Sequence, residues 1–110
     1  MDSILTLALA LAATTAAAPP PEALGSFSVT VSELDYPIEA LKLQQQGDTT
    51  VELLIDRKGG VKECAILVSS GSVYLDVGTC KVMMDKGRFT FANGGRKTVI
   101  TQRLAWKLPR

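Results

Sequence analysis

One stretch decides the fold of this chain: Val61-Lys-Glu-Cys-Ala-Ile-Leu-Val-Ser-Ser-Gly-Ser-Val-Tyr-Leu-Asp-Val-Gly-Thr-Cys80. It begins with a β-strand pattern, breaks at Ser69-Ser70-Gly71, and resumes as a helix from Leu75-Asp76. The stretch also contains both cysteines of a protein that has no histidine. Because histidine is the side chain most often used for proton transfer in catalysis, this composition points away from an enzyme.

The residues before the helix predict a β-hairpin. Residues 49–56 alternate between polar and apolar side chains, which is the period of a strand with one buried face. The glycines of the 56–60 segment suit a hairpin loop, because glycine adopts positive φ without strain. Residues 61–68 then form the returning strand. The buried face of the first strand carries Val51, Leu53 and Ile55.

A helix is predicted on each side of this hairpin. The first runs from Pro37 to Gln46, because proline is tolerated in a first helical turn and Gly47 follows as a stop. The second runs from Leu75-Asp76 to Lys86, where Gly87 ends it. Both helices have apolar side chains at helical spacing, so each is expected to pack on the sheet.

The C-terminal third predicts extended structure. Phe89 and Phe91 alternate in a short piece, and Lys97 to Leu108 forms a long final strand. One face of this strand carries Ile100, Leu104, Trp106 and Leu108. The other face carries Val99, Thr101, Arg103, Ala105 and Lys107. Near the N-terminus, Ser26 to Val31 also alternates and is a candidate for a short extra strand.

The length and composition of the chain indicate one small globular domain. The chain has 110 residues, of which 46% are hydrophobic and 21% charged. Lys and Arg number 12 against 11 Asp and Glu. A net charge this small supplies no field that would attract nucleic acid, so we expect no nucleic-acid partner.

The N-terminal residues differ from the rest. Residues 4–18 are uncharged and end in a run of alanines, which is typical of a secretory signal peptide, although the residues before them carry only Asp2 and no positive charge. The segment is shorter than the about 20 apolar residues of a comfortable membrane span. Residues 1–18 are therefore predicted to be a signal peptide, with a short membrane anchor or a misassigned start as alternatives. Residues 19–34 are then a proline-containing linker and residues 35–110 the domain. Membrane association is expected only if the first segment is retained.

The two cysteines have three interpretations. In an exported protein Cys64 and Cys80 most simply form one disulfide between the second strand and the second helix. Two buried free thiols are the alternative. A redox or metal site is disfavoured, because the spacing is not Cys-x-x-Cys and no histidine completes a ligand set. No metal or cofactor is expected.

Other candidates for chemistry also have structural explanations. Ser69 and Ser70 precede a glycine, but no histidine or evident lysine would act as their base. Asp35, Asp56 and Asp76 lie at the ends of predicted elements, where capping and turns explain them. The sequence therefore predicts a protein that is not an enzyme.

The succession of motifs resembles a known family. Tyr36-Pro37, the Val51 to Asp56 pattern with Gly60-Val61, Val68-Ser-Ser-Gly71, Leu75-Asp76 and Arg88-Phe89 occur in the order and register of the TonB C-terminal-domain family. The resemblance covers about Asp35 to Leu108. It implies an α+β fold: a small antiparallel three-stranded sheet with two helices packed on one face, in the order helix-strand-strand-helix-strand.

The resemblance also implies a place and a partner. Founding members of that family lie in the periplasm, anchored in the inner membrane, and pair a strand with a short segment of outer-membrane transporters. This chain departs from the energy-transducing members in three ways. Its apolar segment is short and has no histidine, its spacer has few prolines, and Phe91-Ala92 replaces the usual Pro-Ala. Residues 19–34 reach on the order of 50 Å when extended, which weakens the case for energy transfer between two membranes.

Two classes of function remain. The first is a periplasmic or inner-membrane-anchored module that binds a protein partner along the last strand, because two of the three possible strand orders leave that strand at an edge. The second is an envelope structural or assembly protein that forms a homodimer through the same edge. The expected binding residues are Val99, Thr101, Gln102, Arg103, Ala105 and Lys107.

Overall fold

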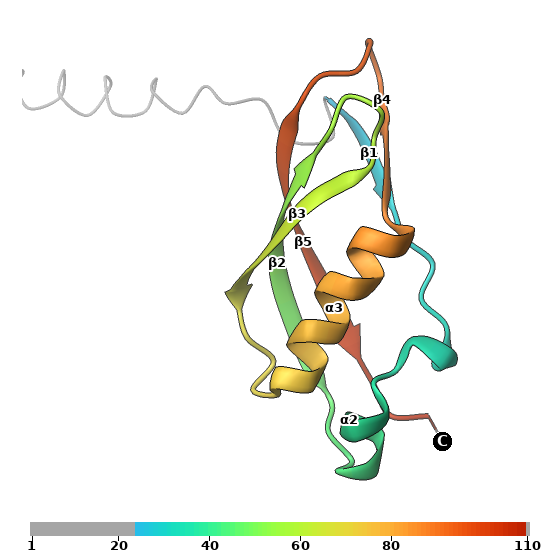
Figure 1. Ribbon diagram of the computed structural model, residues 1–110, viewed down its shortest axis with the longest axis vertical. Coiled ribbons are helices and arrows are strands. Elements are labelled where there is room, and N and C mark those ends of the chain that lie inside the picture. Colours follow the sequence, from blue (N-terminus) through green and yellow to red (C-terminus); the bar gives the residue numbers. More distant parts are fainter. Residues whose placement is uncertain (1–23, 110) are drawn as a thin grey trace, which may run out of the picture.

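The computed structural model describes residues 24–109. The predicted signal peptide and the first part of the linker lie outside this range. The described strands are β1 (Gly25–Ser28), β2 (Gly47–Ile55), β3 (Val61–Val68), β4 (Arg88–Phe91) and β5 (Thr98–Trp106). The helices are a 3-10 turn (Glu33–Asp35), α2 (Ile38–Lys42) and α3 (Val73–Lys86). The α+β class and the order helix-strand-strand-helix-strand are therefore confirmed, with β1 and β4 in addition (Figure 1).

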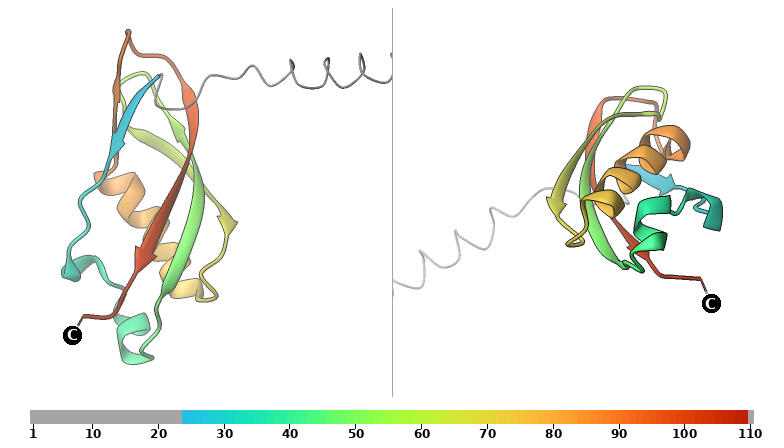
Figure 2. Two further views of the ribbon diagram at one scale, coloured as in Figure 1. Left: turned by 180° about the vertical axis from the view of Figure 1, so that it is seen from behind. Right: turned by 60° about the horizontal axis from the view of Figure 1, so that its bottom comes forward.

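The strands form two antiparallel sheets. The three-stranded sheet has the order β3-β2-β5, so the hairpin's first strand is central and the final strand is at an edge. The remaining strands pair with each other, Gly25 with Phe91 and Phe27 with Phe89. A single bridge between Gly60 and Arg88 joins the start of β3 to β4. Seen from behind, β5 and β2 lie in front of the helices, which cover the opposite side of the sheet (Figure 2).

The hairpin loop is built on glycine as predicted. The Asp56 N–H donates to the Gly60 carbonyl at 2.9 Å, and the Gly59 N–H donates to the Asp56 carbonyl at 3.0 Å. Gly59 has φ of 90°, which a side chain would strain. The Asp56 carboxylate also accepts from the backbone of Lys58 and Gly60, which holds the pKa of Asp56 below its ordinary value. These bonds fix the register of β2 against β3.

The core lies between the sheet and α3. Fully buried Leu53, Ile55 and Met83 lie at its centre, next to Phe89. A second cluster surrounds Trp106, whose ring meets that of Tyr36 edge-to-face at 5.2 Å. Trp106 is 3% exposed, and its indole N–H donates to the Thr79 hydroxyl on α3 at 2.8 Å. This buried bond ties the end of β5 to the helix.

The first predicted helix is shorter than expected. The sequence predicted Pro37–Gln46, whereas α2 spans Ile38–Lys42. The chain leaves the helix because Gln44 adopts φ of 55°, with its N–H bonded to the Leu41 carbonyl and the Gln45 N–H bonded to the Ala40 carbonyl. Gln45 is then held by the Tyr36 and Ser72 hydroxyls, which donate to its carbonyl and side-chain oxygens. These tertiary contacts outweigh the helical pattern that continues to Gln46.

Capping at the two helices also differs from the expectation. Asp35 does not cap α2, because Pro37 is its N-cap residue. Instead the Asp35 carboxylate accepts from the Ser32 N–H at 2.9 Å and pairs with Lys86 at 2.8 Å. The second helix begins at Val73, two residues before the predicted start, because the Ser72 hydroxyl accepts from the Leu75 N–H at 3.2 Å.

Asp76 organises the turn between β3 and α3. Its carboxylate accepts bonds from the hydroxyls of Thr49, Ser69 and Ser70 and from the Ser70 N–H. Partial burial raises the pKa of Asp76, but these hydrogen bonds outweigh burial, so that the pKa lies below the ordinary 3.8. The Ser-Ser-Gly break therefore has a structural explanation: its serines donate hydrogen bonds to the Asp76 carboxylate in the first turn of α3.

We expect Asp76→Asn to lower the free energy of unfolding by about 1–3 kcal/mol at pH 7, since it removes charge-assisted hydrogen bonds. A depressed pKa means that the stabilisation is complete above the unfolded pKa and is lost as pH falls through the folded pKa. The difference between wild type and variant should therefore shrink below about pH 4. Urea unfolding at pH 7 and at acid pH measures it. Asp85→Asn is the matched control, because Asp85 is exposed and pairs only with Lys81 at 3.2 Å; equal losses in the two variants would contradict the prediction.

Candidate functional site

The candidate site is the outer edge of β5. The strand spans Thr98–Trp106, nine residues, so it begins one residue later and ends two residues earlier than the predicted Lys97–Leu108 strand. Val99, Thr101, Arg103 and Ala105 are exposed on one face, as expected. Gln102 lies half-buried on the opposite face, which also bears Ile100. Lys107 follows the end of the strand and is exposed.

The backbone of β5 presents unpaired groups along this edge. Alternate residues of a strand direct their N–H and C=O groups to opposite neighbours. The Asp56 N–H bonds to Gly60 across the hairpin and therefore points toward β3. Counting from Asp56 toward the start of β2, every second residue also directs its N–H and C=O groups toward β3. The residues between them direct these groups toward β5. Two of the residues that point toward β5 are Val51 and Leu53, which lie opposite Gln102 and Ile100 of β5. The even-numbered residues of β5 therefore bond to β2.

The odd-numbered residues of β5 point the other way. The N–H and C=O groups of Val99, Thr101 and Arg103 are directed away from the sheet, toward the side where no strand of residues 24–109 pairs with β5. Such a row of unpaired groups is a template for an added strand. A test of strand addition therefore has to replace one of these outward N–H groups.

Charge contributes little at this edge. Arg103 Nε lies 3.7 Å from the Asp48 carboxylate, and both side chains are largely exposed, at 70% and 47%. An exposed pair of this kind stabilises by about 0–1 kcal/mol. The Arg103–Asp48 pair therefore adds little to the stability of this edge.

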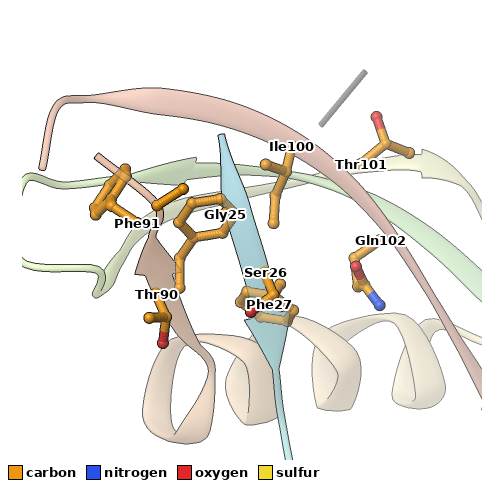
Figure 3. A pocket seen from close by; sticks show the side chains of 10 residues that line it. Gly25, Ser26, Phe27, Thr90, Phe91, Ile100, Thr101 and Gln102 are labelled. Atoms are coloured by element: carbon orange, nitrogen blue, oxygen red, sulfur yellow. The ribbon is translucent and has the colours of Figure 1, made fainter. Parts of the chain in front are cut away.

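A cavity of about 680 Å³ opens beside this edge. It is lined by residues 25–27 of β1, residues 89–92 around the end of β4, and Ile100, Thr101 and Gln102 of β5. Figure 3 shows β1 between β4 and β5, with the labelled side chains of β5 on the far side of the cavity from Phe91. The sequence predicted the β5 wall but not the β1 wall, although the alternation of Ser26 to Val31 marked the region as a candidate strand.

The other predicted site is the cysteine pair. Cys64 of β3 and Cys80 of α3 form a disulfide with a Cα–Cα distance of 5.6 Å and a sequence separation of 16. The bond closes the strand–turn–helix unit on itself. Among residues 24–109 no group of three or more His, Cys, Asp or Glu side chains could hold a metal ion.

Comparison with known proteins identifies the family. The model of the Gram-negative bacterial TonB protein C-terminal family matches residues 32–108. The chain belongs to this family. The resemblance inferred from the motif order is thus confirmed, and the match begins three residues before the predicted domain start at Asp35.

A solved structure agrees with the TonB C-terminal fold. The solution NMR structure of the Pseudomonas aeruginosa TonB C-terminal domain is 20% identical in sequence, with a TM-score of 0.57. The match covers 76% of this chain and 88% of that one. At this identity the similarity establishes the fold. A search of curated proteins found no match.

Proposed function

We propose that this TonB C-terminal domain is a periplasmic protein-binding module that takes up an extended segment of an outer-membrane transporter by strand addition to β5. The observation that carries the proposal is the edge position of β5, with Val99, Thr101 and Arg103 directing backbone groups outward. Membership of the TonB family supports a protein partner of the transporter class. The domain acts by binding rather than by catalysis.

Export of the protein is part of the same proposal. A disulfide such as Cys64–Cys80 persists in oxidising compartments, which include the bacterial periplasm. The apolar pattern of residues 4–18 is consistent with a secretory signal. Within residues 24–109 the structure has no helix that is long and apolar enough to cross a membrane.

The test is a titration with defined peptides. Synthetic peptides that cover the N-terminal periplasmic segments of the source organism's outer-membrane transporters are titrated one by one into the oxidised protein by calorimetry. At least one segment should bind, and a peptide with the same composition in scrambled order should not. Analytical sedimentation of the protein without peptide measures its oligomeric state and so tests the alternative role in envelope assembly. A dimer formed by a protein that binds none of the segments would replace this proposal with the envelope assembly role.

A further inference from the structure

Among residues 24–109, the β1 strand has a second unpaired edge. The Ala92 N–H donates to the Leu24 carbonyl at 2.9 Å, so the even-numbered residues of β1 face β4. Gly25 and Phe27 therefore direct their N–H and C=O groups away from β4. The opposite side of β4 is already occupied, because the Phe89 N–H donates to the Gly59 carbonyl at 2.8 Å. The free edge of the two-stranded sheet is thus the β1 edge.

The two free edges face one cavity. The cavity of about 680 Å³ is lined on one side by Gly25, Ser26 and Phe27 and on the other by Ile100, Thr101 and Gln102. Figure 3 shows these two groups of side chains from β1 and β5. We call this cavity, between the edges of β1 and β5, the slot.

Both walls of the slot run in the same direction. β5 is antiparallel to β2, and β2 is antiparallel to β3. The bridge of Gly60 with Arg88 is antiparallel, and so is the pairing of β4 with β1. Following these relations around the molecule makes β1 and β5 parallel to each other (Figure 1). One strand placed between them can be antiparallel to both, and antiparallel is also the pairing of all neighbouring strands within residues 24–109.

We propose that the partner segment enters the slot and pairs with β1 as well as with β5, so that its backbone is bonded on both sides. This inference rests on the proposed function and deepens it. The five described strands already follow each other in space as β1, β4, β3, β2 and β5. The added strand closes them into a ring and leaves no free edge between β1 and β5.

The lining of the slot indicates the chemistry of the segment. None of the residues that line it is charged, and Phe27, Phe91 and Ile100 contribute apolar surface. A charged side chain directed inward would lose water without gaining a partner. The segment is therefore uncharged over the part inside the slot, with small or apolar side chains on the inward face. β1 has four residues, or about 13 Å of strand, so about four residues of the partner are enclosed.

Alternate N-methylation of the peptide tests two-sided pairing. The probe is the transporter segment that binds most tightly in the titration above, made in two forms in which every second amide is methylated, the two forms being offset by one residue. In a strand bonded on one side only, one of the two forms keeps all its hydrogen bonds, because its methyl groups point to solvent. In the slot, both forms lose bonds, and we expect Kd to rise by about tenfold or more for each.

Protein variants give the matching test. Phe27→Pro removes an outward N–H of β1, and Phe27→Ala is its control, because both variants lose the aromatic ring and only the first loses the amide. We expect Phe27→Pro to bind the peptide about three- to tenfold more weakly than Phe27→Ala. Melting curves and amide exchange at Thr90 show whether β1 stays paired with β4. If β1 detaches from β4 in the proline variant, the methylated peptides alone decide the question.

Each result decides the question. Weaker binding of both methylated peptides than of the unmodified peptide supports two-sided pairing in the slot. If one form binds as well as the unmodified peptide, the slot is overturned and addition to β5 alone stands. If no transporter segment binds, the proposed function fails and the slot with it. A peptide-free dimer that is abolished by both Phe27→Pro and Thr101→Pro would assign the slot to a second copy of the chain and overturn the inference.

Discussion

Replacing Cys64 and Cys80 together by alanine is expected to lower the melting temperature by about 12–24 °C. Their disulfide closes a loop of 16 residues in sequence separation, and a loop of about this length contributes about 3 kcal/mol. In a domain of this size, 1 kcal/mol corresponds to about 4–8 °C. The loss is a large fraction of the total stability of a small domain. Differential scanning calorimetry of the oxidised protein and the double variant measures it.

The variant should still fold. Leu75, Val82 and Met83 of α3 remain buried without the disulfide, so the helix keeps its apolar contacts. The destabilisation arises in the unfolded state, where the open chain has more conformations. Reductant is therefore expected to lower the wild-type melting temperature to that of the variant and to leave the variant unchanged. Two reactive thiols in the unfolded, unreduced wild-type protein, with equal melting temperatures for both proteins, would contradict the prediction and the exported location together.

Local patterns were sufficient to predict the hairpin and the second helix. The alternation of Val51, Leu53 and Ile55 and the glycines after Asp56 are short-range signals, and the structure places these residues as expected. The end of α2 was not predictable in this way. It depends on Gln45, which is held by Tyr36 and Ser72. Contacts with residues that are 9 and 27 positions away in sequence leave no mark on the local period.

The candidate site needed the topology as well. The exposed face of β5 could be predicted from its alternation, but its edge position could not, because one of the three possible strand orders would have placed β5 in the centre. The pairing of β1 with β4 joins residues that are sixty or more positions apart, through four residues on each strand. Segments this short carry too little pattern to specify a partner. The β1 wall of the slot therefore became visible only when both sheets were placed in space.

Replacing Thr101 by proline is expected to weaken binding of a transporter segment at least about tenfold while the protein stays folded. Thr101 is exposed, and its N–H points away from β2 into the free edge. Proline is tolerated in a strand where the N–H faces outward, so the ladder with β2 should persist. A partner strand loses one hydrogen bond and meets the pyrrolidine ring. Thr101→Ala is the matched control, since it removes the side chain and keeps the amide.

Gln102→Pro supplies the opposite case. The Gln102 N–H points toward Val51 of the central strand, so its loss breaks the ladder that holds the core-facing side of β5 in register. This variant should melt well below wild type or fail to fold. Arg103→Glu, which removes only the exposed pair with Asp48, should change binding by a factor of about five or less. Calorimetric titration beside a melting curve for each variant measures both quantities. If Thr101→Pro folds and binds like Thr101→Ala, backbone pairing at β5 is not how the partner is held, and side-chain contacts elsewhere on the domain must supply the affinity.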